Sequence, residues 1–136
     1  MFGYTVRPAG IADVQYVYRM NTKLLGSALS EKQSEKAFRS ILFDAEQTVL
    51  LVIHSGNAVG YIHAQQVNNL YEEMHTRIVS FAVYEYYLDK KAVDELVKAV
   101  EQWSRQMLSA FVRSDCVEMK NFGYREITPG RLEKTL

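Results

Sequence analysis

The residues most able to do chemistry stand between a β-prone run and an amphipathic helix. Ile78–Tyr84 is apolar and β-prone, and from Val93 onward apolar residues recur every three or four positions, as on one helix face. The chain between them is therefore predicted to connect a strand to a helix. Backbone N–H groups and the helix dipole favour an anion at such a helix start, so we expect any phosphorylated ligand at Leu88–Val93.

Charged side chains in this segment support different hypotheses. Asp89 stands where an N-cap residue would, and its carboxylate would accept hydrogen bonds from the N–H groups of Lys91 and Ala92. In that case the protein fills its own anion site. Lys90 and Lys91 could instead hold phosphates from outside, or they could simply form a solvated helix start.

The segment from Ala82 to Trp103, AVYEYYLDKKAVDELVKAVEQW, resembles the central motif of the GNAT superfamily of CoA-dependent N-acyltransferases. In that family a backbone N–H of the fourth strand polarises the thioester, and the following loop binds the CoA pyrophosphate. The resemblance implies acetyl-CoA or CoA as a co-substrate. The positions that it assigns to this ligand are Phe81, Ala82, Val83, Leu88, Asp89, Lys90, Lys91, Ala92 and Val93.

The loop departs from the family pattern of Arg or Gln, two free positions, Gly, one free position, then Gly or Ala. Leu88, Lys91 and Val93 occupy the specified positions, and β-branched Val93 is predicted to be the bulkiest obstacle to a phosphate. The family's proton-donating Tyr falls on Met119, which cannot donate a proton. Two functions therefore stay open. One is acetyl transfer to a small-molecule or protein amine, and the other is a catalytically inactive GNAT-fold module that binds a protein partner or another small ligand.

A base for the amine has four candidates near the fourth predicted strand. Glu72, Glu73 and His75 stand at its start, and Glu85 follows its end. Each could equally be an ordinary surface residue. Neither the histidines nor the single Cys116 show the spacing of a metal site, so we expect no metal.

Length and composition predict one domain spanning residues 1–136. Sixteen basic and sixteen acidic residues balance, so the net charge indicates neither nucleic acid nor an anionic membrane as a partner. No apolar run approaches the roughly 20 residues that span a bilayer, and no signal-peptide pattern is present, so we expect a cytoplasmic location. The resemblance adds a possible homodimer.

The expected fold class is α+β, a GNAT-like fold with a central mixed, mostly antiparallel sheet flanked by helices. Capping residues predict helices over about 13–25 and from Ser30 onward, the second with Ala37, Phe38, Ile41 and Leu42 facing inward. Strands are expected at 4–7, 48–53, 58–67, 76–84 and 110–113, with a brief helix from residue 114 or 115 to about 123. Residues 124–127 and 131–136 are expected to supply a last strand that Pro129-Gly130 could interrupt, and the resemblance implies a closing hairpin there.

Aromatic residues raise two further hypotheses. The first two helices border the acceptor side in the family, so the resemblance implies that Tyr16, Tyr18 and Phe38 line a substrate cleft, with core packing as the alternative. The run of Tyr84, Tyr86 and Tyr87 could stack on an adenine or substrate ring, form a subunit contact, or pack beneath the loop.

Overall fold

Seven strands of the described chain form a single sheet. The computed structural model describes residues 3–88, 91–114, 125–128 and 131–136, and the strand order in these segments is β1-β2-β3-β4-β5-β7-β6. β4 and β5 are parallel, and the other neighbouring strands are antiparallel. The predicted mixed, mostly antiparallel sheet is therefore confirmed. The strands are β1 (Tyr4–Pro8), β2 (Gln47–His54), β3 (Asn57–Val67), β4 (His75–Val83), β5 (Phe111–Ser114), β6 (Arg125–Thr128) and β7 (Arg131–Thr135).

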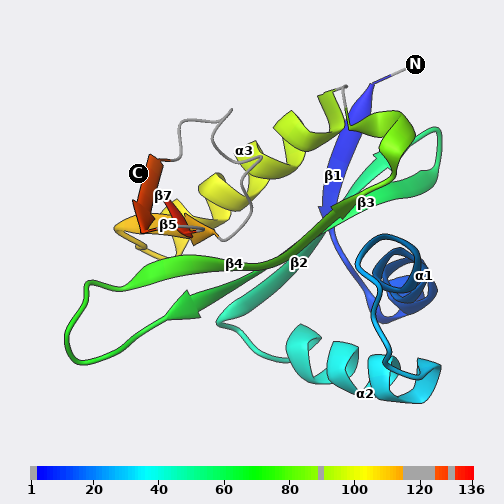
Figure 1. Ribbon diagram of the computed structural model, residues 1–136, viewed down its shortest axis with the longest axis horizontal. Coiled ribbons are helices and arrows are strands. Elements are labelled where there is room, and N and C mark those ends of the chain that lie inside the picture. The colour runs from blue at the N-terminus through cyan, green and yellow to red at the C-terminus, as the bar shows by residue number, and fades with distance from the viewer. Residues whose placement is uncertain (1–2, 89–90, 115–124, 129–130) are drawn as a thin grey trace.

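Helices cover both faces of this sheet, with α3 on one face and α1 and α2 on the other (Figure 1). In the described segments none of the helices is long and apolar enough to cross a bilayer. The helices are α1 (Val14–Leu24), α2 (Glu31–Leu42) and α3 (Lys91–Gln106), and two short 3₁₀ turns are η1 (Ile11–Asp13) and η2 (Glu85–Tyr87).

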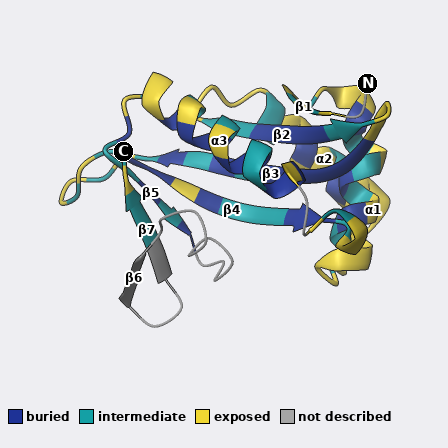
Figure 2. Cartoon of the chain, turned by 90° about the horizontal axis from the view of Figure 1, so that it is seen from above, coloured by how far each residue is buried: buried dark blue, intermediate teal, exposed yellow. Residues whose placement is uncertain are grey.

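The larger core lies between α3 and the sheet. Leu96 and Val100 on α3 are fully buried, and they belong to the same apolar cluster as Val52 and Ile62 in the central strands. The three-to-four spacing that predicted this helix is therefore the spacing of its buried face. Figure 2 shows the buried stretches running through β2, β3 and β4 beneath the helices.

The second core lies under α1 and α2. Val17, Met20 and Phe38 pack with Leu51 and Tyr61 of the sheet. α2 begins at the predicted capping box, because Ser30 Oγ accepts from the Gln33 N–H at 3.1 Å and Gln33 Oε1 accepts from the Ser30 N–H at 2.9 Å.

The prediction that Ala37 faces inward is wrong, because Ala37 is exposed. Consecutive helical residues point about 100° apart. Phe38 takes the buried position next to Ala37, which leaves Ala37 at the edge of this face.

The C-terminal strands close the far end of the sheet. β5 pairs with β7, and Lys134 of β7 bonds to Glu101 of α3 at 2.9 Å. β6 and β7 are two paired strands in the stretch predicted as a last strand that Pro129-Gly130 could interrupt. The predicted brief helix, with Cys116 and Met119, lies outside the described residues.

An ion pair fixes the chain where it passes from β1 to η1. Arg7 donates two hydrogen bonds to the Asp13 carboxylate, at 2.8 and 2.9 Å, and the Gly10 N–H donates a third at 2.8 Å. Asp13 is buried. The hydrogen bonds from Arg7 are the main reason that the pKa of this carboxyl lies below its usual value.

Replacing Asp13→Asn should lower the free energy of unfolding by about 1–2 kcal/mol at pH 7, because charge-assisted hydrogen bonds are lost. A depressed pKa stabilises the fold above the unfolded value of about 3.9, and this contribution disappears as the pH falls through the folded pKa. Urea unfolding at pH 7 and pH 3 checks this. The difference between wild type and variant should shrink at pH 3.

The exposed Arg39–Glu35 pair provides the control. Glu35→Gln should cost no more than about 0.5 kcal/mol. Equal losses in the two variants would contradict a special role for Asp13.

Candidate active site

The site begins where β4 continues beyond its parallel neighbour. β4 pairs with β5 only from Thr76 to Ile78, and the described part of β5 ends at Ser114. β4 itself continues to Val83. The edge of β4 from residue 79 to residue 83 therefore has no strand partner on this side among the described residues.

Two backbone N–H groups point toward this open edge. The Tyr84 N–H donates to the Val59 carbonyl of β3. In an antiparallel ladder every second residue directs its N–H to the same neighbouring strand, so the N–H of Ala82 also points to β3. The alternation of an antiparallel ladder then turns the N–H groups of Phe81 and Val83 the other way. These are donors that a thioester carbonyl could meet, in the region that the sequence predicted.

A bulge in β4 sets which side chains face each way. His63 pairs with Ser80 and Ala64 pairs with Ile78, so Val79 is the extra residue. Ile78 packs in the α3 core, whereas Ser80 lines a cavity under α1 and α2. In a regular strand without the bulge, residues 78 and 80 would point to the same face.

Gly60 allows β3 to lie close behind this edge. A Cβ at Gly60 would lie 2.7 Å from Val83 Cγ2 and 2.9 Å from the Ala82 carbonyl oxygen. No side chain fits there unless β4 moves. The position of the two donors thus depends on glycine in the neighbouring strand.

A largely apolar cavity of about 460 Å³ lies at this end of β4. Its only ionisable lining residue among those described is Glu85. It brings together four of the predicted ligand-binding residues with the end of α1. The lining residues are Leu24, Leu25, Phe81, Ala82, Val83, Glu85 and Leu88.

The start of α3 completes this region. Lys91 is exposed in its first turn, whereas Ala92 and Val93 are buried in the α3 core. The Val93 side chain packs against the sheet and away from solvent, and its predicted obstruction of a phosphate stays a prediction. Asp89 and Lys90 lie outside the described residues.

Three of the four predicted bases lie at the other end of β4. His75 and Val83 are the two ends of the strand, roughly 25 Å apart at the usual rise per residue. Glu72 and Glu73 precede His75, so none of the three reaches the N–H groups of the open edge. Only Glu85 lies in the cavity there.

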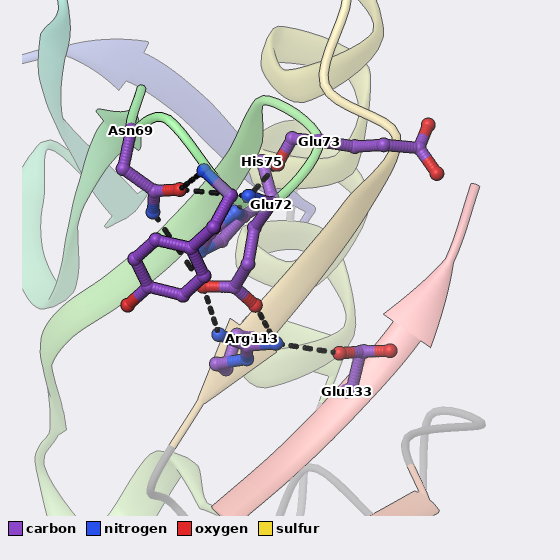
Figure 3. A network of polar contacts seen from close by, with 7 residues as sticks. Asn69, Glu72, Glu73, His75, Arg113 and Glu133 are labelled. Atoms are coloured by element: carbon purple, nitrogen blue, oxygen red, sulfur yellow. Dashed lines mark hydrogen bonds and ion pairs between the residues drawn. The ribbon is translucent and has the colours of Figure 1, made fainter.

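Glu72 and His75 instead belong to a polar network around Arg113, which Figure 3 shows. Arg113 donates to Glu72 at 2.9 Å, and this bond is the main cause of the lowered pKa of the Glu72 carboxyl. Buried His75 donates from Nδ1 to the Glu73 carbonyl at 2.9 Å and stacks on Phe111 at 4.5 Å between ring centroids. These contacts give Glu72 and His75 a structural role in the described chain.

A second cavity, of about 160 Å³, lies between α1, α2 and the sheet. Phe38 lines it and also packs in the core under α1 and α2, whereas Tyr16 and Tyr18 are not among its described lining residues. The substrate cleft itself stays a prediction. Its polar wall comes from Asn21, Ser34, Tyr61, His63 and Ser80, none of which was predicted to line a site. The apolar lining consists of Val14, Val17, Leu29, Ala37, Phe38, Ile41 and Val49.

This polar wall is held by hydrogen bonds. Tyr61 donates to Asn21 Oδ1, and the Ser80 hydroxyl lies 3.0 Å from the Tyr61 oxygen. Burial is the main cause of the raised pKa of the Tyr61 hydroxyl, so it keeps its proton at neutral pH. The alternation of Tyr61 and His63 along β3 is the sequence signal that could have identified this wall.

The three tyrosines at the end of β4 behave differently from one another. Tyr87 packs beneath the loop, with ring centroids 6.2 Å from Tyr4 and 5.6 Å from His54. Tyr84 packs against the α1–α2 core, and Tyr86 is exposed. Tyr84 and Tyr87 therefore have packing roles, as one of the three hypotheses proposed.

Metal ligands are not gathered in the described part of the chain, where no group of three or more His, Cys, Asp or Glu residues could hold an ion. His54 and His63 lie on β2 and β3 respectively.

Comparison with known proteins adds a family match. The model of the acetyltransferase (GNAT) family matches residues 14–123. Among the curated proteins none matches this chain.

Several solved structures share the fold. The aminoglycoside antibiotic 6'-N-acetyltransferase of Acinetobacter baumannii is 17% identical, with 93% of each chain covered and a TM-score of 0.82. The aminoglycoside N-acetyltransferase AAC(6')-Iy, solved with the bisubstrate analogue CoA-S-monomethyl-acetylneamine, is 14% identical, with 93% of each chain covered and a TM-score of 0.82. A transcriptional regulator from Bacillus halodurans C-125 is 13% identical, with 93% of this chain and 95% of the other covered and a TM-score of 0.82. At these identities the likeness shows the fold alone.

Replacing Gly60→Ala should lower the free energy of unfolding by about 1–3 kcal/mol, because the added methyl overpacks the contact with β4. Thermal or urea unfolding measures this loss. Gly10→Ala is the matched control, since a Cβ there meets only Asp13 Oδ2, at 3.8 Å. If both variants unfold alike, the close approach of β3 and β4 does not constrain residue 60.

Proposed function

This chain belongs to the acetyltransferase (GNAT) family, and on that premise we propose that it transfers an acetyl group from acetyl-CoA to a primary amine. The observation that carries the proposal is the open edge of β4, where the N–H groups of Phe81 and Val83 face away from β3 beside an apolar cavity. Acetyl transfer needs a held thioester and donors for the oxygen that becomes negative.

The β4 edge supplies those donors without any particular side chain. A thioester carbonyl against the Phe81 or Val83 N–H would gain a hydrogen bond that strengthens as the amine attacks, a contribution of about 3 kcal/mol for one well-placed donor. The carbonyl carbon gains a bond to nitrogen and loses its bond to sulfur. The apolar lining from Leu24, Leu25 and Leu88 suits the uncharged arm of acetyl-CoA.

The phosphates are assigned to the start of α3. The N–H groups of a helix start attract anions, and exposed Lys91 adds a positive charge in the first turn. The burial of Val93 supports this assignment, because its side chain packs in the α3 core and away from solvent.

The structural neighbours support the co-substrate. AAC(6')-Iy has been solved with CoA and with a bisubstrate analogue, on the same fold and over nearly the whole of this chain. The acceptor does not follow from this similarity, because the fold serves many amines and the identity is low.

Acetyl-CoA should raise the melting temperature of this protein, because a ligand that binds only the native state adds about 2.7 kcal/mol at a hundredfold excess over Kd. The charge reversal Lys91→Glu should weaken binding roughly tenfold, or about 1.4 kcal/mol, if Lys91 meets the phosphates. Calorimetric titration measures both affinities.

Lys36→Glu is the control, because Lys36 is an exposed lysine on α2, on the opposite face of the sheet. It should leave the affinity unchanged. No thermal shift at millimolar acetyl-CoA would overturn the proposed function and favour the inactive binding module that the deviant loop suggests.

A further inference from the structure

The cavity under α1 and α2 adjoins the proposed thioester position. Ser80 lines this cavity and Ala82 lines the cavity at the open edge. Side chains two residues apart on a strand point to the same face, about 7 Å from each other. α1 likewise borders both cavities, through Asn21 in one and Leu24 in the other. One end of a ligand in the cavity under α1 and α2 would therefore lie beside the acetyl group that is transferred.

We propose that this cavity binds the acceptor as a primary amine with a small apolar body, and that His63 removes the amine's proton through Nδ1. The inference rests on the proposed function and deepens it by naming the acceptor class and the base.

Size and charge select the acceptor class. The cavity's 160 Å³ is close to the roughly 150 Å³ of an apolar cavity that holds a benzene ring. None of its described lining residues is acidic. A polycation such as an aminoglycoside would lose its hydration here without carboxylates to replace it, whereas one amino group can use the polar wall. The apolar body would lie among Phe38, Ile41 and Val49.

A chain of hydrogen bonds fixes which nitrogen of His63 is free. The Gln47 amide donates from Nε2 to Asp44 Oδ2 at 2.9 Å, so Gln47 must present Oε1 to His63 Nε2, 2.7 Å away. An amide oxygen only accepts, so Nε2 of His63 carries the hydrogen. In a neutral ring Nδ1 then keeps its lone pair, and no described residue donates to it. Gln47 and Asp44 are positioning residues.

The groups around His63 keep it neutral. Burial, and then the charge of Arg77 on β4, lower the pKa of His63 below its usual value. Polar residues near the ring include Ser80, its partner on β4, Tyr61 on β3, which keeps its proton, and the Asp44 carboxylate behind Gln47. At neutral pH the ring is therefore a base and not an acid.

The step balances without another reactant. The ammonium gives one proton to His63 Nδ1, and the freed lone pair forms the bond to the thioester carbon. The C–S bond breaks, and sulfur leaves with the electron pair as a thiolate. The second proton lost from nitrogen passes to the thiolate, which gives an amide and CoA.

Binding tests the cavity without turnover. 2-Phenylethylamine titrated into the protein without acetyl-CoA should bind, and Ala37→Phe at the cavity rim should weaken binding at least tenfold. Ala45→Phe, an exposed residue outside the lining, should not. On binding, the ¹⁵N resonance of His63 Nδ1 should move more than that of Nε2. Failure of phenylethylamine to bind, or an unmoved Nδ1, overturns the inference even in a protein that binds acetyl-CoA.

Turnover tests the base. The pH profile of kcat/KM for phenylethylamine should fall on the acid side as His63 gains a proton, and Gln47→Glu should move this limb to higher pH because a carboxylate stabilises the imidazolium. His63→Gln should lower kcat/KM by about 10²–10⁴ and remove the limb. His54→Gln on β2 should leave both kcat/KM and the acid limb of the pH profile unchanged. Loss of the limb in Glu85→Gln alone, or faster transfer to an aminoglycoside than to phenylethylamine, overturns the inference and leaves the acetyltransferase intact.

Discussion

Backbone hydrogen bonding along β4 is the constraint on which the whole arrangement depends. Within the sheet, neighbouring strands satisfy each other's backbone N–H and C=O groups. β4, however, extends past Ile78 without a described strand on its β5 side. Buried N–H groups need a hydrogen-bond partner, and no described strand supplies one on this side of β4. The β3 strand holds that edge in place, because Gly60 lets the two backbones meet closely. Everything proposed for acyl transfer uses donors whose position is set by this pairing.

Local signals predicted most of the fold. The apolar spacing from Val93 onward described the buried face of α3, and the Ser30–Gln33 pair marked the start of α2. Such features depend on neighbours within a few residues, so they can be seen in the chain itself. Ala37 shows the limit, since the direction of one helical side chain depends on which neighbour takes the core position.

The site was harder to predict because its parts meet through the sheet. His63, Ser80 and Gln47 come from three strands, and strand register and the β4 bulge bring them together. Glu72 and His75 looked suitable because they are close to β4 in sequence, yet a strand is long and they stand at its wrong end. Backbone donors, by contrast, carry no residue type, and only the family resemblance directed attention to Phe81 and Val83.

The bulge at Val79 has a consequence for how this strand can change over time. Single side chains in β4 can be substituted, but the number of residues between Ile78 and Val83 sets the face of the sheet to which each side chain points. A single residue inserted before Ser80 and paired as part of the ladder would exchange the two faces of the strand. It would turn Ser80 into the aliphatic interior and Phe81 toward the small cavity, whereas loss of the bulged Val79 itself would leave the faces unchanged. The length of this segment is therefore constrained more strongly than its residue types. Mutant libraries of the protein should keep that length fixed.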